Sequence, residues 1–546
     1  MAGLRPIVPT VTTTVGLSRT ASGSEVPTAA ERARPPWRHE DPVIAWTGAL
    51  LVTGIAFFLR WWQLDTPHQF SFDETYYAKD AWSMLAHGYV REYVEDADKS
   101  IINGETGDLW KDSPSMIVHP EVGKWLIALG IKTFGMDPFG WRIASAVIGS
   151  LMVLVMCRFT RRVTGSTVLG LVGGLLLSLD GLQLVLSRLG LLDIFVAFFI
   201  LCGVHCVVAD RQSFRARLAA GRSRVLVRPW LIAGGVAFGL AAGTKWTAAF
   251  PLAAFGLLSF AWSWGGRHAF GQRHAWAKAL ADGAGSFVQL VLVALVVYVA
   301  SWTGWLVHAH EYEQALSNTQ YTAHGGGKQW PTATEPDAEG IGEVVQSVRS
   351  LWSYHHDVFA FHEHFLNGGE HVYASKPIGW LLLNRPVGVD AQLEIKPGTQ
   401  GCDAPAGSTC LRQVILLGNP LIWWAGSLAL LCALVRWVGA RDWRFGVAVV
   451  GTTSTWLPWI RFDDRPIFFF YAVVCLPFLV LGLTLALGAI VGSTDRPSPR
   501  RTAGVILSGS YVVLALLMFA WFWPIWTDQL ITHGEWLKRM WFSRWI

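Results

Sequence analysis

The stretch "VIAWTGALLVTGIAFFLRWWQLDTPHQFSFDETYY", residues 43–77, joins a long apolar run to a pair of carboxylates. A membrane-spanning helix needs about twenty largely apolar residues, and residues 43–60 approach that length. Asp73 and Glu74 follow a few residues later, among aromatic side chains. The stretch therefore predicts a membrane helix that leads to a carboxylate-bearing surface loop.

The composition of the whole chain agrees with this prediction. Of the 546 residues, 52% are hydrophobic and only 15% are charged, whereas soluble proteins carry about 25% charged residues. The chain also holds 30 Trp, and indoles collect at membrane–water boundaries. We therefore expect a polytopic membrane protein, whose formal net charge of +5 reflects its orientation in the bilayer and not a nucleic-acid partner.

The expected fold class is an all-α polytopic membrane protein with about 11 transmembrane helices. The candidate spans lie at 43–60, 139–157, 167–184, 190–209, 230–244, 246–264, 284–306, 416–435, 444–460, 467–490 and 503–523. Residues 1–42, rich in Ser, Thr, Pro and Arg, predict a disordered cytoplasmic arm. The remaining parts are an N-terminal module at 43–306 (spans 1–7, with outer loop 62–138), an extracytoplasmic loop at 307–415 and a four-helix module at 416–546.

Lys and Arg concentrate in alternate loops, among them "RFTRRVTG", "RQSFRARLAAGRSRVLVRP" and "STDRPSPRR". The loops between them are acidic or neutral. Because positively charged loops stay on the cytoplasmic side, we expect the N-terminus inside and the C-terminus outside. In a bacterium this predicts a multi-pass protein of the cell membrane, with the acidic pair on its outer face.

The acidic pair has two interpretations. One or both carboxylates could cap a helix or carry a solvated surface charge. However, Phe72, Tyr76 and Tyr77 surround Asp73 and Glu74, so the pair is expected in a partly apolar crevice. A carboxylate in such a place is costly and is usually retained for function.

Four more charged residues are expected on the outer side, namely Arg142, Arg188, Asp193 and Lys245. Each has a structural alternative: an Arg at a helix end, an Asp as helix N-cap, or a Lys that snorkels to the interface. Lys245, however, runs against the positive-inside trend and could hold a phosphate. Transfer of a group from a lipid-phosphate donor needs cations to stabilise the phosphate leaving group and a base to accept the proton of the attacking hydroxyl. The outer cations and carboxylates of this chain suit such a reaction.

Several motifs in order resemble those of the protein O-mannosyltransferases, within the C-type glycosyltransferase (GT-C) fold. They are "FDETYYAKDAWSM", "HPEVGKWLIALG", "FGWRIASAVIGS", "SRLGLLD", "GTKWTA", "YASKPIGWLLLNRPV", "GNPLIWW" and "WLPWIRFDDRPIFFFYAVVCLPF". The resemblance covers nearly the whole membrane portion. The motifs after residue 370 are the more specific ones, because many C-type enzymes carry an acidic motif in their first outer loop.

The resemblance implies transfer of mannose, with inversion, from a polyprenyl-phosphate-mannose donor to Ser or Thr hydroxyls of exported proteins. The implied acceptors are Ser/Thr-rich chains, which could emerge from the secretion machinery into contact with this protein among its membrane lipids. Asp73 matches the catalytic acidic position and Glu74 its companion. Arg142 and Lys245 match basic positions that we connect with the donor phosphate.

Two departures from the family pattern are visible. His119 and Lys124 match a His-Pro-Pro…Gly-Lys element expected near the substrate, but Glu121 replaces its second Pro. Eukaryotic members carry a β-trefoil domain in the long outer loop, for which 307–415 is too short. The bacterial, trefoil-free branch is therefore the better match.

Cysteines and histidines add two smaller predictions. Cys402 and Cys410 share the polar outer loop "GCDAPAGSTC", and an oxidising compartment would favour a local disulfide between them. Histidines cluster at 355, 356, 362 and 364, but no pair has the i, i+4 spacing of a helical metal site. We expect no cofactor, although a divalent metal at Asp73 stays open.

Two other functions remain as alternatives. The first is a C-type transferase that moves another lipid-linked sugar onto a glycolipid or a cell-wall glycan. The second is a transporter that uses Asp73, Glu74 and Asp193 as a proton relay. Transporters, however, place such groups near the bilayer midplane within repeated halves, and this chain shows no internal repeat.

Overall fold

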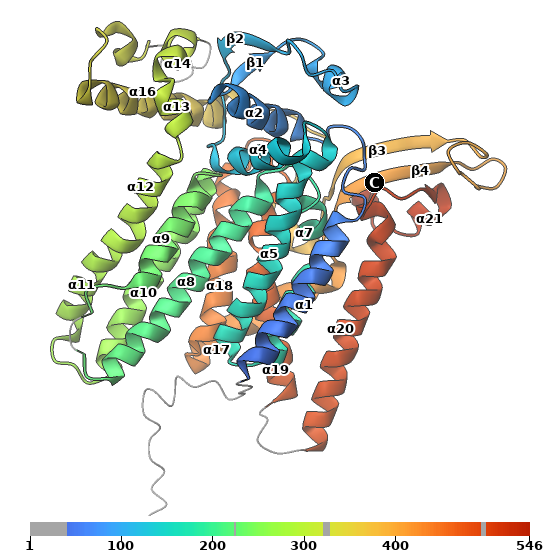
Figure 1. Cartoon of the computed structure of the whole chain (residues 1–546). Coiled ribbons are helices and arrows are strands. Elements are labelled where there is room, and N and C mark those ends of the chain that lie inside the picture. Colours follow the sequence, from blue (N-terminus) through green and yellow to red (C-terminus); the bar gives the residue numbers. More distant parts are fainter. Residues whose placement is uncertain (1–40, 223–224, 320–327, 368, 493–497) are drawn as a thin grey trace, which may run out of the picture.

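The structure is a computed structural model that describes residues 41–222, 225–319, 328–367, 369–492 and 498–546. The predicted arm at 1–42 therefore lies almost wholly outside the described residues. The described chain forms a bundle of upright helices with a layer of shorter elements across one end (Figure 1). We call this end, which carries α2 (Glu74–His87), α4 (Val122–Phe134) and α16 (Ile341–Ala360), the loop end. The C-terminus lies at the loop end, whereas α1 (Pro42–Trp61) begins at the opposite end.

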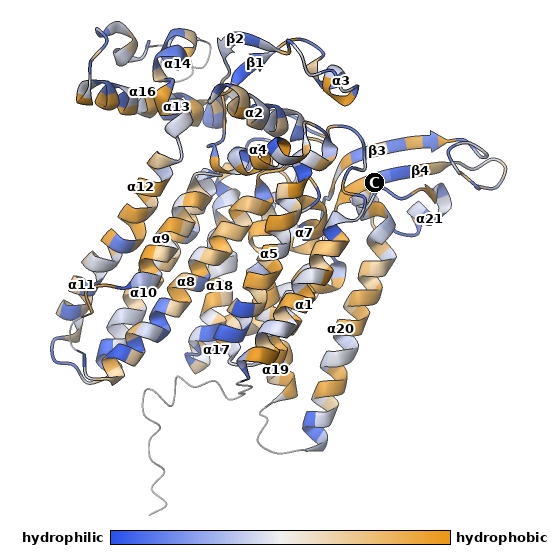
Figure 2. Ribbon diagram, viewed as in Figure 1, coloured by the Kyte–Doolittle hydropathy of each residue, from blue (hydrophilic) through white to orange (hydrophobic). Residues whose placement is uncertain are grey.

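The upright helices follow the expected spans. After α1 they are α5 (Pro138–Thr164), α6 (Thr167–Ser178), α8 (Asp193–Ala219), α9 (Pro229–Ala242), α10 (Ala249–Ala269), α11 (Ala275–Ser286) and α12 (Val293–Ala300), then α17 (Pro420–Ala440), α18 (Trp443–Trp456), α19 (Leu476–Val491) and α20 (Pro499–Trp526). Their residues are mostly hydrophobic, and hydrophilic residues gather at the two ends of the bundle (Figure 2). The all-α multi-pass fold is confirmed.

The count of eleven spans is not confirmed. Within the described ranges, seven helical segments are long and apolar enough to cross a membrane, accompanied by three shorter apolar helices, α6, α9 and α19. The reason lies in local breaks of the helices. For example, α18 gives way to a 3-10 turn at Leu457–Phe462, and α19 is preceded by another at Phe469–Val474.

The starts of the upright helices follow from the sequence. Asp41, Asp137, Asn419 and Ser498 each accept a hydrogen bond from a backbone N–H of the first helical turn. Each is followed directly by Pro, which suits the first helical position because its missing N–H would be unpaired there anyway. This local chemistry explains why these boundaries could be found by inspection.

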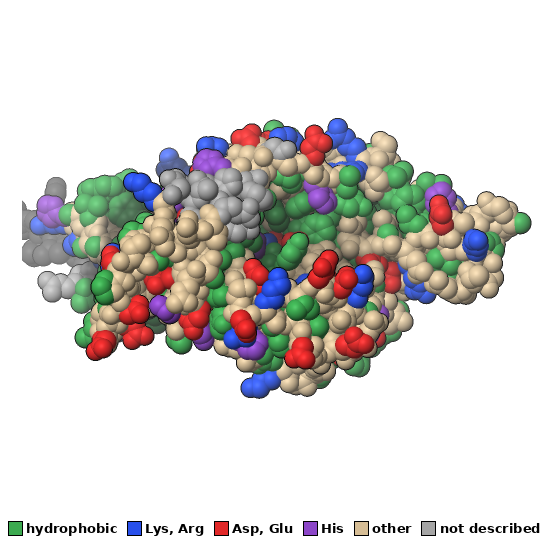
Figure 3. Space-filling view, turned by 90° about the horizontal axis from the view of Figure 1, so that it is seen from above, with side chains coloured by type: hydrophobic (Ala, Val, Ile, Leu, Met, Phe, Trp, Pro, Cys, Tyr) green, Lys and Arg blue, Asp and Glu red, His purple; other side chains and the backbone are tan. Residues whose placement is uncertain are grey.

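Small sheets and short helices cover the loop end. Strands β1 (Arg91–Tyr93) and β2 (Trp110–Pro114) pair antiparallel, and β3 (Val387–Ile395), β4 (Cys410–Leu416) and β5 (Ile531–Thr532) form an antiparallel sheet in that order. Short helices α3 (Ala97–Ile102), α13 (Thr303–Val307), α14 (Ala309–Leu316) and α21 (His533–Leu537) complete the layer. Seen onto this end, acidic side chains are spread over the surface, with hydrophobic ones exposed between them (Figure 3).

A buried polar network joins the two membrane modules that the sequence predicts. Asp180, which caps α7 (Gly181–Leu186), accepts hydrogen bonds from the Asn419 backbone N–H and the Trp423 indole, each at 2.8 Å. The Asn419 side chain donates in turn to the carbonyl oxygens of Leu179 and Ala515. Because buried polar groups of this kind must be satisfied together, the modules at 43–306 and 416–546 pack as one unit.

Candidate active site

Asp73 lies at the first turn of α2, where the capping interpretation can be examined. Although it occupies the N-cap position, its side chain makes no capping hydrogen bond. Its Oδ2 instead accepts a long hydrogen bond, 3.4 Å, from the Tyr77 hydroxyl one turn later. The preceding Phe72 has a φ of +54°, a left-handed conformation that turns the chain sharply into the helix. The carboxylate of Asp73 is therefore half-buried and largely unengaged.

Glu74 has a different environment, although it is the next residue. It is completely buried, and its Oε1 accepts from Arg142 Nε at 2.8 Å and from the Gly190 backbone N–H at 2.7 Å. Its Oε2 accepts from Arg142 Nη2 at 2.7 Å and from the Ser71 backbone N–H at 2.9 Å. With both oxygens occupied in this way, Glu74 anchors the loop and has no lone pair directed at a substrate.

The structure corrects the expectation that Arg142 and Arg188 contact a substrate. Arg142 is completely buried, and besides Glu74 it donates to the carbonyl oxygens of Leu64, Pro67 and Gln69. Buried Arg188 donates to the carbonyl oxygens of four residues that end the first span and follow it, namely Leu59, Arg60, Trp62 and Gln63. Both guanidinium groups hold the segment after α1 in place and do not face the Asp73 carboxylate.

Lys245 and Asp193 form a second charged pair beside Asp73. Lys245 Nζ lies 3.0 and 2.8 Å from the two Asp193 oxygens and 5.0 Å from the centre of the Tyr471 ring. Both charged side chains are buried, which does not agree with a Lys that snorkels to the surface. They line one cavity with apolar side chains, among them Val196 and Trp459.

The electrostatics of Asp73 follow from this arrangement. Burial raises the pKa of the Asp73 carboxyl to about 6, with Lys245 and the Tyr77 hydroxyl opposing the shift and Asp193 adding to it. At neutral pH the group is therefore mostly ionised, yet its proton affinity is well above that of an ordinary Asp. A general base works best when its pKa lies near the working pH.

A third group of side chains borders the site, namely His119, His362 and Arg465. The imidazole rings of His119 and His362 stack with centroids 5.9 Å apart, and His119 lies 6.1 Å from Tyr77. Arg465 Nη1 lies 2.8 Å from His362 Nδ1 and donates to it. Burial lowers the pKa of His119 well below its usual value and that of His362 to about 4, where Arg465 adds to the effect. Both imidazoles are therefore neutral at physiological pH.

Arg465 differs from the other cations of the site in its partners. Within the described ranges no carboxylate lies at ion-pair distance from Arg465, whereas Arg142, Lys245 and Lys124 each have one. Lys124, which the sequence placed near the substrate, is buried and paired with Asp80 at 2.8 Å, so it joins α4 to α2. Arg465 therefore has the charge that is free for an anionic ligand.

Sequence reasoning missed Arg465 and Tyr471 as members of the site, and it named Tyr77 only as an aromatic neighbour of the acidic pair. The contact of Tyr77 with Asp73 could have been predicted, because i, i+4 positions face each other on a helix. Arg465 lies in the quoted motif "RFDDRP", between two Asp and a Pro. From its sequence, this segment is expected only to form part of an acidic or neutral outer loop.

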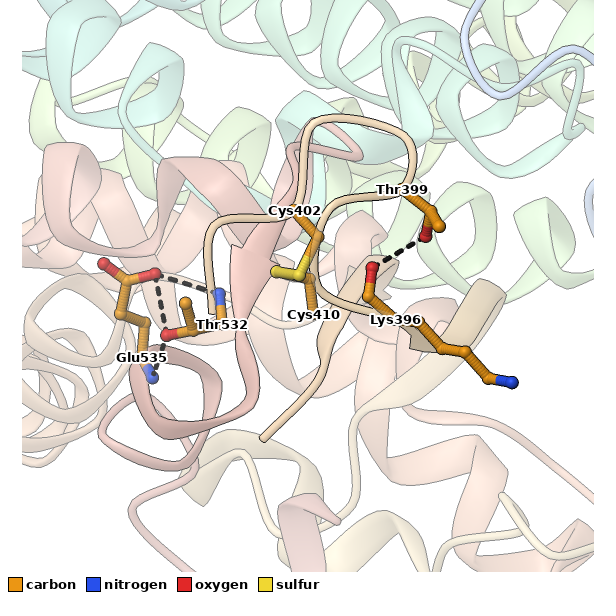
Figure 4. The surroundings of a disulfide bond; sticks show 6 residues. All are labelled: Lys396, Thr399, Cys402, Cys410, Thr532 and Glu535. Atoms are coloured by element: carbon orange, nitrogen blue, oxygen red, sulfur yellow. Dashed lines mark hydrogen bonds between the residues drawn. A yellow bond between two sulfur atoms is a disulfide. The ribbon is translucent and has the colours of Figure 1, made fainter. Parts of the chain in front are cut away.

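Cys402 and Cys410 lie away from this group. The structure joins their sulfur atoms with a Cα–Cα distance of 5.8 Å, at the end of the hairpin formed by β3 and β4. Thr532 of β5 pairs with Cys410, so the C-terminal strand lies beside the disulfide (Figure 4). The hairpin extends away from the helix bundle (Figure 1).

A metal at Asp73 finds little support in the donor set. Over the described ranges no group of three or more His, Cys, Asp or Glu side chains could hold an ion. Asp193 is neutralised by Lys245, and Glu74 by Arg142. A divalent cation would need several free oxygen ligands, so we assign none here.

Comparisons with known proteins place the chain in a family. Residues 50–300 match the family described as dolichyl-phosphate-mannose-protein mannosyltransferase, and residues 347–545 match the C-terminal four-span region of protein O-mannosyltransferases. A polyprenol-phosphate-mannose–protein mannosyltransferase of Mycolicibacterium smegmatis is 32% identical, covering 96% of this chain and 100% of that protein. The chain belongs to this mannosyltransferase family.

Two further similarities support the assignment to the protein mannosyltransferases. The enzyme of the same name from Mycobacterium tuberculosis is 35% identical over 87% of this chain and 86% of its own length. A structure of the S. cerevisiae Pmt1–Pmt2 O-mannosyltransferase complex bound to the sugar donor superposes with a TM-score of 0.69 at 14% identity, covering 95% of each chain. This similarity concerns the fold and supports the C-type architecture. The protein is therefore a glycosyltransferase, and the transporter alternative is excluded.

Proposed function

We propose that this protein transfers mannose from a polyprenyl-phosphate-mannose donor to Ser or Thr hydroxyls of exported proteins, at the loop end of the bundle. The observation that carries the proposal is the Asp73 carboxylate, which is half-buried, largely unengaged and next to the Lys245–Asp193 pair. A base beside cations is what this reaction needs. The names of the relatives supply the sugar and the class of acceptor.

In the proposed step, the acceptor hydroxyl oxygen attacks the anomeric carbon of mannose while the bond from that carbon to the phosphate oxygen breaks. The hydroxyl proton moves to Asp73, and the electron pair of the broken bond leaves on polyprenyl phosphate. Attack opposite the leaving group inverts the configuration at the sugar carbon. Glu74 takes no part in the proton transfer, because Arg142 and two backbone N–H groups occupy its oxygens.

The phosphate contacts are assigned to Lys245 and Arg465. Arg142 and Arg188 spend their donors on Glu74 and on backbone carbonyls. An ammonium group has three N–H donors, and two of those of Lys245 are directed at Asp193, so a third is left for a ligand. Arg465 donates only to the neutral His362 among the described residues. A guanidinium and an ammonium together can bind a phosphate from two sides.

The sidedness of the reaction is part of the proposal. Arg161 and Arg162 in the last turn of α5, Arg217 in the last turn of α8, and Arg500 and Arg501 at the start of α20 lie at the end opposite the loop end, and Arg-rich segments of this kind stay cytoplasmic. The loop end would then face outward from the cell membrane, with the N-terminus inside and the C-terminus outside. A C-terminal alkaline phosphatase fusion should be active in cells, and an inactive fusion beside an active one placed after Gly398 would contradict this orientation.

The activity itself can be tested with purified full-length protein in nanodiscs, radiolabelled polyprenyl-phosphate mannose and a Ser/Thr-rich peptide. We expect label on the peptide, none with an Ala-substituted peptide, and loss of labelling in Asp73→Asn. Label that moves to a glycolipid or cell-wall glycan while the peptide stays unlabelled would favour the alternative acceptor class. A separate experiment in inverted membrane vesicles would compare the labelling of an exported protein during and after its translocation. Labelling only during translocation would show that acceptors are mannosylated as they leave the secretion machinery.

A further inference from the structure

Helix α16 carries an apolar face that no described part of the chain covers. Six apolar side chains on it are exposed, with exposed fractions from 42% to 85%. They are Ile341, Val344, Val345, Val348, Trp352 and Phe359. With 3.6 residues per turn, these positions fall within a sector of about 100° around the helix axis. The exposure is therefore organised as one continuous stripe.

The neighbouring side of α16 packs against the protein and fixes the rotation of the helix. Leu351, Tyr354 and Val358 are buried in a cluster with Trp305, on α13, and Trp330. The Tyr354 hydroxyl accepts a hydrogen bond from the Ile117 backbone N–H at 2.8 Å. The apolar stripe therefore cannot turn inward without breaking this packing.

His355 shows in which direction the stripe faces. Its position falls inside the sector of the stripe, between Val344 and Val348, and its ring stacks on Trp246 with centroids 5.3 Å apart and an angle of 20°. The His355 Nε2 also contacts the Tyr298 hydroxyl. Tyr298 lies two residues before the end of the span formed by residues 275–300, and Trp246 begins another. The stripe therefore faces the level at which the membrane helices end.

The surface of the bundle next to α16 carries exposed apolar side chains. On α12, Leu295 and Val296 are exposed, and so is Val307 at the end of α13, which connects α12 to the loop end. In Figure 1, α16 lies across the top of α12, and one end of it extends beyond α12 away from the bundle. The apolar stripe thus continues the exposed apolar surface of α12 past the end of the helix.

We propose that α16 is an interfacial helix whose apolar stripe is inserted among the lipids of the membrane surface at the loop end. Trp352 near the middle of the stripe suits this depth, because indoles prefer the headgroup region. Arg349, the single Lys or Arg of α16, is not free for a lipid phosphate, because it pairs with Glu335 at 2.7 Å. The attraction is therefore apolar, as in amphipathic helices that lie in the interface, and does not depend on anionic lipid.

The seat of α16 has a consequence for the site. The helix continues into the π-helical turn Phe361–Phe365, which carries His362 next to Arg465. If α16 is held at the membrane surface, His362 and Arg465 stay at a constant depth relative to a donor whose polyprenyl chain lies in the bilayer. The inference about α16 does not itself require that the protein transfers mannose.

The test uses the full-length protein in nanodiscs, with photoreactive benzoylphenylalanine at one position at a time. We expect lipid adducts by mass spectrometry after illumination for Val344, Val348 and Trp352, and none for the control positions Glu343 and Ser353 on other sides of the helix. The adducts should form equally in dioleoyl phosphatidylcholine and dioleoyl phosphatidylglycerol.

Three outcomes would overturn the proposal. Crosslinks from the stripe to a second copy of the chain would make it a protein interface. The absence of lipid adducts at all three stripe positions, in protein that elutes as a single species, would place α16 in water. Adducts only with phosphatidylglycerol would mean an electrostatic headgroup contact in place of the apolar insertion argued from these residues.

Discussion

Replacing Asp73 with Asn separates the base from the rest of the site. Asn has nearly the same shape as Asp and can still accept the hydrogen bond from the Tyr77 hydroxyl, which reaches Asp73 at 3.4 Å. The amide cannot accept the proton of the acceptor hydroxyl. Because no hydrogen bond to the Glu74 anchor is changed, we expect Asp73→Asn to fold, insert in the membrane and bind the donor as the parent does.

The magnitude follows from the proposed role and from the environment of the carboxyl. Loss of a general base lowers the rate by about 10² to 10⁴, which corresponds to about 3 to 5 kcal/mol in the activation free energy. The pKa of Asp73 is raised to about 6, and the base acts only when it is ionised. The parent kcat/KM should therefore be full above pH 7 and fall about tenfold per pH unit below pH 6, and Asp73→Asn should lose this dependence.

The assay is the transfer of labelled mannose to a Thr-rich peptide in nanodiscs, followed from pH 5 to pH 8 with donor binding measured in parallel. The control is Tyr77→Phe, which removes the hydrogen bond to Asp73 but keeps the carboxylate, so its activity should fall much less. Transfer by Asp73→Asn at near the parental rate, or an unchanged acid limb in this variant, would refute Asp73 as the base.

Three further predictions follow from the partners of individual side chains. Glu74→Gln leaves the buried charge of Arg142 uncompensated, so it should cost about 3–5 kcal/mol of stability, seen as a lower melting temperature in detergent. An unchanged melting temperature would contradict the pairing. Arg465→Ala should raise the donor KM by about 10- to 100-fold through loss of a charged hydrogen bond, and Arg465→Lys should restore it in part. A donor KM equal to that of the parent protein would mean that another cation binds the phosphate. Removing the Cys402–Cys410 bridge should cost about 2–3 kcal/mol within the hairpin only, so proteolysis after reduction should cut there while transfer activity remains, and loss of activity with an intact hairpin would contradict this.

Parts of this structure follow from local properties of the chain. Runs of apolar residues that are long enough to cross a bilayer determine where the upright helices lie, and Asp-Pro, Asn-Pro and Ser-Pro pairs determine where several of them begin. The eight-residue separation of Cys402 and Cys410 allows a bridge without any distant contact. The ordered motifs indicated the family before any contact was known.

The roles of the charged residues were not determined in this way, and the acidic pair shows why. Asp73 and Glu74 are adjacent, so on a helix their side chains point about 100° apart. One direction leads to Arg142, 68 residues further along the chain, and to the backbone of Gly190; the other leads to Tyr77 and the Lys245–Asp193 pair. No local pattern distinguishes the two carboxylates.

The same holds for the cations. From the sequence, Arg142 and Lys245 were equal candidates for a phosphate, and Arg465 was not considered. A charge is available to a ligand only if no nearby carboxylate or carbonyl uses its donors, and those partners come from segments far apart in the chain. The sequence therefore determined where the apolar helices lie, the possibility of the Cys402–Cys410 bridge and part of the site, including Asp73, Asp193 and Lys245. Only the tertiary structure decided which carboxylate and which cation remain free, because long-range packing distributes the partners among them.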